Sequence, residues 1–195
     1  MPESNRLPRS FFARHTVDVA RDLLGARLVR LEEGGKRVSG MIVETEAYRG
    51  EDDQGCHCRA GPTERTAVMY GPPGVAYVYF IYGMHWLLNV VTEDEGFPGA
   101  VLIRGLEPEE GLDLMGARRD GQPEEHWTDG PAKLCQALRV DGRFNGEDTC
   151  SPESALFLER GIDIPERRIH ATPRIGLNSV PEPWKSVPWR FVVQE

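Results

Sequence analysis

Apolar and aromatic residues are densest between positions 74 and 91, in the stretch GVAYVYFIYGMHWLLNVV. The run from Tyr77 to Ile81 is β-branched and aromatic, which is typical of a strand. Tyr82-Gly83 can reverse the chain, because Gly adopts positive φ without steric conflict. The apolar residues from Trp86 to Val91 then form a return strand. Since both faces of this hairpin are apolar, we expect most of it to be buried.

Two residues do not fit a simple core hairpin. Asn89 is polar inside the return strand, and Tyr82 is a large aromatic at a turn, where small polar residues are usual. One interpretation is a central hairpin with a hydrogen-bonded Asn and a packed Tyr. The other is a projecting ribbon whose apical aromatic enters a nucleic-acid groove and wedges between bases.

The rest of the chain predicts short elements on both sides of the hairpin. Val17, Ala20, Leu23 and Leu24 have helical spacing, with Thr16 or Asp18 as a cap and Gly25 as the end. Strands are expected at residues 28–31 and 38–47, around a polar turn at 33–36. Later strands are expected at 99–106 (ending at Pro108), 156–158 and 189–193, with helices at 112–119 and after a cap at Asp129.

The twenty residues from Tyr48 to Ala67 lack apolar periodicity, and so long a loop is either functional or disordered. No repeat or linker divides the chain, and 195 residues suit one domain, so we expect a single domain over 1–195. The 21 Gly and 15 Pro favour strands and irregular loops over long helices.

Composition restricts the class of protein further. The net charge of −8 argues against a generic basic nucleic-acid module. No apolar run reaches membrane-spanning length, and residues 1–10 contain no apolar signal segment, so no membrane partner is expected. The four cysteines, at 56, 58, 135 and 150, lack disulfide-framework spacing, which favours a reducing cytoplasmic location.

Candidate chemistry begins with two carboxylates. Glu44 and Glu46 lie two apart and therefore share one face of a strand. Buried carboxylates are unfavourable unless they are paired or functional, so an edge strand facing water is one interpretation. The other is a catalytic carboxylate in a pocket, completed by Tyr48 and by His57 and Arg59 if the long loop folds back.

A metal site is a weaker alternative. Cys56-His57-Cys58 lacks the second ligand pair of a zinc site, and no cofactor motif is present, so we expect neither metal nor cofactor. A metal-dependent hydrolase stays open as an alternative, and it would be built on Glu46, Asp52, Asp53 and His57.

Six blocks in order resemble the 3-methyladenine DNA glycosylase family of the alkyladenine (methylpurine) type. They span nearly the whole chain, which is more specific than any single block. The blocks are Ala20–Gly25, Met41–Tyr48, the His57 loop, Tyr77–Asn89, Leu102–Pro108 and Gly130–Leu138.

This resemblance implies a mixed α+β single domain, with a curved, largely antiparallel sheet flanked by helices and a protruding β-hairpin. It implies a monofunctional hydrolase that flips 3-methyladenine, 7-methylguanine or hypoxanthine out of duplex DNA and cleaves the N-glycosidic bond. The implied partner is damaged double-stranded DNA, which would also associate the protein with the nucleoid. We expect a monomer that needs no metal, cofactor or lyase step.

The resemblance also implies roles for individual residues. Glu46 would be the general base and Arg104 would hold the attacking water and a nearby phosphate. Tyr82 would intercalate into the DNA, and the Arg174-Ile175-Gly176 backbone would border the pocket. The flipped base would be bound by Tyr48, His57, Tyr79 and Asn89.

The acidic chain must gather its basic side chains on one face to bind duplex DNA. The candidates for that face are Arg59, Arg65, Arg104, Lys133, Arg139, Arg143 and Arg174. A non-catalytic nucleic-acid-binding module, with the hairpin as a wedge, is the remaining alternative.

Overall fold

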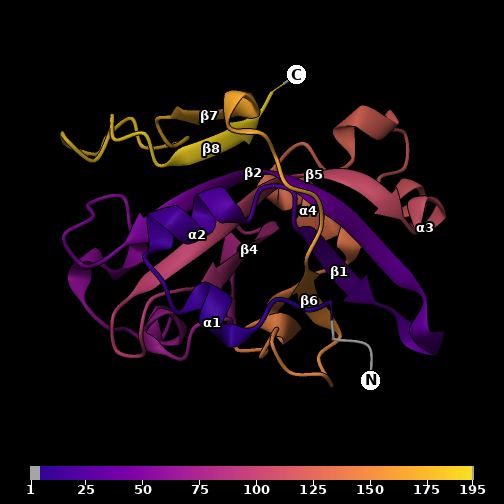
Figure 1. The fold of residues 1–195 in the computed structure, drawn as a ribbon, viewed down its shortest axis with the longest axis horizontal. Helices are drawn as coiled ribbons and strands as arrows, with labels where there is room; N and C mark the ends of the chain where they lie inside the picture. Colours follow the sequence, from indigo (N-terminus) through magenta and orange to yellow (C-terminus); the bar gives the residue numbers. More distant parts are fainter. Residues whose placement is uncertain (1–4, 195) are drawn as a thin grey trace.

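Eight strands form one curled antiparallel sheet in the computed structural model, which describes residues 5–194 (Figure 1). The strand order is β3-β4-β5-β2-β1-β6, and β8 pairs with both β2 and β7. The strands are β1 (Arg27–Leu31), β2 (Arg37–Arg49), β3 (Ala76–Ile81), β4 (His85–Val91), β5 (Gly99–Glu110), β6 (Leu156–Glu159), β7 (Ile169–Thr172) and β8 (Arg190–Val193).

Four short α-helices accompany the sheet: α1 (Arg9–Phe12), α2 (Thr16–Asp22), α3 (Leu112–Arg118) and α4 (Pro131–Leu138). Helix α2 packs on β2 and β5, and α4 packs on β4 and β5. Their apolar side chains belong to one core together with those of the sheet. The described residues therefore form a single mixed α+β domain, as predicted. The predicted domain limits, 1 and 195, lie outside the described residues.

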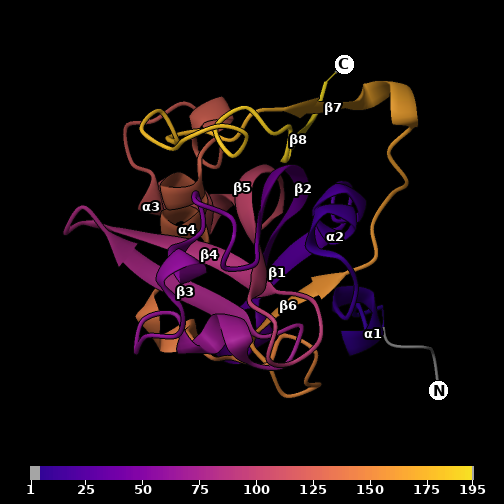
Figure 2. The ribbon, with the colours of Figure 1, turned by 90° about the vertical axis from the view of Figure 1, so that its left-hand side faces the viewer.

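Burial of the central hairpin differs from the sequence prediction. Strands β3 and β4 reverse through Tyr82 (φ 54°) and Gly83 (φ 69°), two positive values that suit a tight hairpin turn. The base of the hairpin is buried, but Phe80, Tyr82 and Met84 are 45%, 83% and 67% exposed. The prediction of a mostly buried hairpin is wrong for the outer half, which extends away from the body of the domain (Figure 2).

Strand β2 is central where it carries Glu44 and Glu46. It pairs with β5 on one side and, at Glu44–Glu46, with β8 on the other. The edge-strand interpretation of the two carboxylates is therefore wrong. The register with β5 shifts on both sides of Glu44, and Arg104 has no partner residue on β2. Such bulges change the direction of a side chain, and this one places Arg104 beside the two carboxylates.

Several predicted boundaries also need correction. Strand β5 continues through Pro108, which lies opposite Gly40 at a register shift, where its missing N–H is tolerated. The N-cap of α2 is His15, and the Thr16 hydroxyl donates to Glu93 instead.

The N-cap of α4 is Gly130, whereas the sequence predicted Asp129. The Asp129 carboxylate binds Lys133 and His126 instead. Strand β7 was not predicted. No helix within residues 5–194 has both the length and the hydropathy needed to cross a membrane.

Candidate active site

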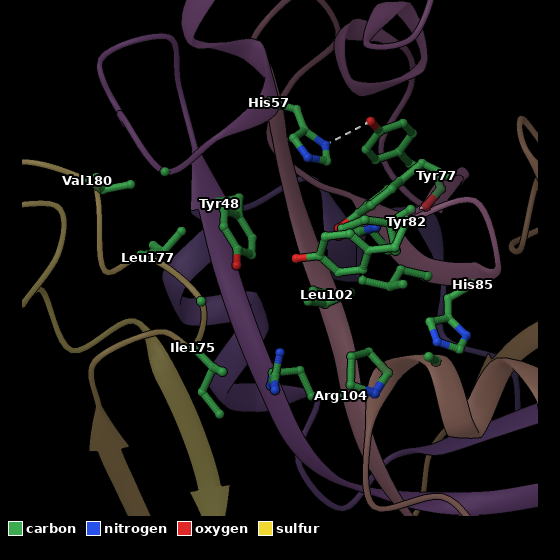
Figure 3. A pocket seen from close by; sticks show the side chains of 18 of the residues that line it. Tyr48, His57, Tyr77, Tyr82, His85, Leu102, Arg104, Ile175, Leu177 and Val180 are labelled. Carbon is green, nitrogen blue, oxygen red and sulfur yellow. Dashed lines mark hydrogen bonds between the residues drawn. The ribbon is translucent and has the colours of Figure 1, made fainter.

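A cavity of about 450 Å³ opens beside the projecting hairpin (Figure 3). Its walls come from β2, β3–β4, β5, the loop after β2, the start of α4, and residues 175–180. Strand periodicity and the β3–β4 register place one face of the hairpin toward it. That face consists of Tyr77, Tyr79, Ile81, His85, Leu87 and Asn89.

The long loop after β2 folds back over the sheet, as the functional interpretation required. Cys56 and Cys58 are fully buried in a small cluster that includes Tyr77. His57, between them, lines the cavity, where its Nδ1 lies 3.1 Å from the Tyr77 hydroxyl. Its ring is 4.6 Å from that of Tyr79 in an edge-on arrangement. The structure thus brings His57 together with hairpin aromatics, not with Glu46 as the sequence suggested.

Electrostatics keep His57 uncharged at neutral pH. Burial, with help from the cations Arg65 and Arg59, lowers its pKa from 6.5 to about 4. The Arg65 guanidinium lies 5.1 Å from the Tyr79 ring centre, and its Nη2 lies 3.4 Å from His57 Nε2. A neutral imidazole is therefore the form that faces the cavity.

Glu46 is fully buried between two hydrogen-bond donors and a nearby cation. The Ile175 backbone N–H donates to its Oε1 at 2.7 Å, and the Tyr48 hydroxyl donates to its Oε2 at 2.7 Å. Arg104 Nε lies 3.4 Å from Oε1. All three neighbours line the cavity, so Glu46 lies directly behind the wall that they form. The two donors and the cation fix the orientation of the carboxylate, and an oriented carboxylate suits a general base.

Arg104 is fixed by a second carboxylate. Its Nε donates to Glu44 Oε1 at 2.8 Å, and Arg190 of β8 donates to the same oxygen at 2.6 Å. Although burial opposes it, the carboxylates of Glu46 and Glu44 raise the pKa of Arg104. A permanently charged guanidinium therefore stands at the cavity wall beside Glu46.

Arg174 forms a buried ion pair that the sequence did not reveal. Its guanidinium binds Asp53 at 2.5 and 2.8 Å, and both side chains are fully buried. The guanidinium also lies 4.7 Å from the Tyr48 ring centre and 5.2 Å from that of Trp189. The prediction that Arg174 belongs to a DNA-binding face is therefore wrong. Its residue type gave no signal of this pairing, because Asp53 lies 121 positions away.

The residues of the metal alternative are not brought together. Within residues 5–194, no group of three His, Cys, Asp or Glu side chains is arranged to hold a metal ion. Asp53 is paired with Arg174, Cys58 Sγ donates to the Gly50 carbonyl, and Asp52 is exposed. Geometry gives this alternative no support.

The remaining predicted residues lie along the hairpin. Asn89 is buried, and its Nδ2 donates to the Tyr77 carbonyl at 3.1 Å. Tyr79 lines the cavity, and Tyr82 stands at its rim on the hairpin apex. In Figure 3, Tyr48 lies across the cavity from Tyr77 and Tyr82. The structure therefore gathers all seven predicted site residues at one cavity or directly behind its wall.

Comparison with known proteins identifies the family. The family described as Methylpurine-DNA glycosylase (MPG) matches residues 10–195. Relatives named "Putative 3-methyladenine DNA glycosylase" occur in Myxococcus xanthus and Methanocella arvoryzae, each 48% identical, covering 98% and 95% of this chain and 91% and 90% of their own. A relative of the same name in Carboxydothermus hydrogenoformans is 46% identical over 96% of this chain and 95% of its own. The resemblance seen in the sequence is confirmed, and the chain belongs to the methylpurine-DNA glycosylase family.

Proposed function

We propose that this protein is a monofunctional DNA glycosylase that removes alkylated or deaminated purines, of the 3-methyladenine, 7-methylguanine and hypoxanthine class, from double-stranded DNA. The observation that carries the proposal is a fully buried carboxylate, Glu46, held by two hydrogen-bond donors and paired with Arg104 behind the wall of an aromatic cavity. Family membership supports the same chemistry. The proposed partner is damaged duplex DNA, bound by a monomer.

The cavity suits an extrahelical purine. Tyr48 and Tyr79 present aromatic rings, and alkylated purines carry a positive charge that such faces attract. A base reaches the cavity only after it is flipped out of the stack. A neutral lesion such as hypoxanthine would depend on hydrogen bonds near His57, whose ring is held by the Tyr77 hydroxyl. One cavity can therefore serve both charged and neutral lesions.

Asn89 gives the cavity a means of rejecting normal guanine. Its amide is held by the Tyr77 carbonyl and cannot turn freely away. In our proposal it crowds the exocyclic amino group of guanine, which adenine and hypoxanthine lack, and 7-methylguanine overcomes the same obstacle through the attraction of its positive charge to the aromatic rings. Discrimination then comes from a fixed obstacle as well as from attraction.

Hydrolysis needs a proton acceptor and a fixed water. In our proposal the water lies on the cavity side of Glu46 and Arg104. Glu46 removes a proton from the water while the oxygen of that water bonds to C1′ of the deoxyribose. The C1′–N bond breaks, and the base leaves with the bonding electrons. A cationic alkylated purine leaves as a neutral base, so it needs no added proton.

Tyr82 would keep the lesion out of the helix. It stands at the exposed apex of the hairpin, beside the cavity rim. An aromatic side chain in the vacated stack offsets the unfavourable unstacking of the flipped nucleotide. The hairpin apex would then fill the gap that the flipped base leaves.

The direct test is incubation of the protein with a duplex that carries one hypoxanthine or 3-methyladenine. We expect release of the free base, an abasic site in an unbroken strand, and the same rate with EDTA. A matched undamaged duplex should release nothing. Loss of activity with EDTA would favour the metal-dependent hydrolase, and binding without release would favour a non-catalytic module.

A further inference from the structure

The hydroxyl of Tyr48 contacts a group that the cavity itself does not expose. Tyr48 lines the cavity, whereas Glu46 is fully buried behind it. The hydroxyl donates to Glu46 Oε2 at 2.7 Å, while the Ile175 N–H occupies Oε1. Each carboxylate oxygen therefore has its own donor, and rotation of the carboxylate would break both hydrogen bonds.

The Tyr48 ring is held in place independently of its hydroxyl. The Arg174 guanidinium lies 4.7 Å from the ring centre. Arg174 is in turn fixed by Asp53 and by the Ala47 carbonyl, at 2.5 and 3.0 Å from its Nη1. Removal of the hydroxyl alone should therefore leave the aromatic surface where it is.

The hydroxyl keeps its proton under ordinary conditions. Burial raises the pKa of Tyr48 well above its usual value, and the Glu46 carboxylate raises it further. A neutral phenol beside a carboxylate acts as the hydrogen-bond donor.

We propose that Tyr48 is a positioning residue for Glu46, in addition to stacking on the flipped base. Its hydroxyl and the Ile175 N–H together fix the plane of the carboxylate, so that the remaining lone pairs meet the attacking water. This inference rests on the proposed function, because it assigns a second task to one residue of the same site. The ring acts on binding, and the hydroxyl acts on chemistry through Glu46.

The variant Tyr48→Phe separates these two tasks, because it keeps the ring and removes the hydroxyl. Single-turnover excision of hypoxanthine should slow about 10-fold or more, as expected for one hydrogen bond to a charged group. Affinity for the lesion duplex should stay near that of wild type.

Tyr70→Phe is the matched control. The Tyr70 hydroxyl donates to Glu51 Oε1 at the same 2.7 Å, on an exposed surface and outside the cavity lining. This variant should keep the wild-type excision rate and affinity. Melting temperatures of both variants show that the rates are compared on folded protein.

The outcomes separate the inference from the proposed function. Active wild type, with a Tyr48→Phe variant that excises more slowly at near wild-type affinity, supports the inference. Active wild type with an unchanged excision rate in Tyr48→Phe overturns the inference alone. A Tyr48→Phe variant that loses affinity but keeps its maximal rate also overturns it, since the residue then acts only in binding. Wild type that releases no base overturns both.

Discussion

The backbone N–H of Ile175 donates a 2.7 Å hydrogen bond to Oε1 of Glu46, although the two residues are 129 positions apart. This contact joins the segment before β8 to the centre of β2. The Asp53–Arg174 ion pair lies beside it and joins the same segment to the long loop that carries His57. The segment before β8 and the loop that carries His57 therefore together fix the cavity wall around Glu46.

The Asp53–Arg174 pair should be important for stability. Asp53→Asn leaves the fully buried Arg174 guanidinium without its counter-charge, a change that typically destabilises a protein by about 3–5 kcal/mol. Urea unfolding measures the change in free energy. The control is Asp52→Asn, which alters the exposed neighbouring carboxylate and should leave stability nearly unchanged. Equal stabilities of the two variants would contradict a structural role for the pair.

Replacement of Tyr82 at the hairpin apex should weaken DNA binding without lowering the stability of the protein. Tyr82 is 83% exposed, so Tyr82→Ala should leave the melting temperature nearly unchanged. Loss of aromatic stacking, worth about 1–3 kcal/mol per base, should weaken binding to a lesion duplex roughly 5-fold to 150-fold. Excision should suffer most where the lesion is well paired, and 2-aminopurine fluorescence reports the flipping.

The control for the apex is Ile162→Ala, which truncates another exposed apolar side chain away from the cavity. It should bind the lesion duplex as wild type does. A Tyr82→Ala protein that melts much lower but flips the lesion normally would make Tyr82 a packing residue.

His57 predicts how stability depends on pH. Its pKa is lowered from 6.5 to about 4 in the folded protein, so between these values the unfolded chain binds more protons. The contribution of this group to the free energy of unfolding is therefore fully present above pH 6.5 and falls as the pH decreases toward 4. Replacement by Gln should flatten the slope of unfolding free energy against pH in this window. An identical slope in His57→Gln and wild type would show that another group titrates there.

Local sequence signals were sufficient for the hairpin and for most strands. A β-branched and aromatic run, a Tyr-Gly reversal and a second apolar run describe β3 and β4 without any distant contact. The family resemblance implied that the hairpin protrudes, but the residues alone left open whether its tip is packed or projects, because that depends on which elements cover it. The tip extends beyond them.

The sequence named residues that the structure gathers at one cavity, but it did not predict their hydrogen-bond and ion-pair partners. The family resemblance named Glu46 and Arg104, yet it could not show the bulge that directs Arg104 toward Glu44. Residue types also could not reveal that Arg174 pairs with Asp53, because tertiary packing brings these two distant residues together. The order of motifs thus predicted the family, whereas the geometry of the cavity had to come from the structure.

The central claim is that Glu46 activates the water that releases the base. Glu46→Gln keeps the size of the side chain and removes its basicity, while Glu107→Gln alters an exposed carboxylate on β5 as a control. The decisive measurement is single-turnover release of hypoxanthine from a duplex, with the affinity for that duplex determined in parallel. Glu46→Gln should bind as wild type but release the base roughly 10²–10⁴-fold more slowly, while Glu107→Gln matches wild type. A Glu46→Gln rate near that of wild type would contradict the account.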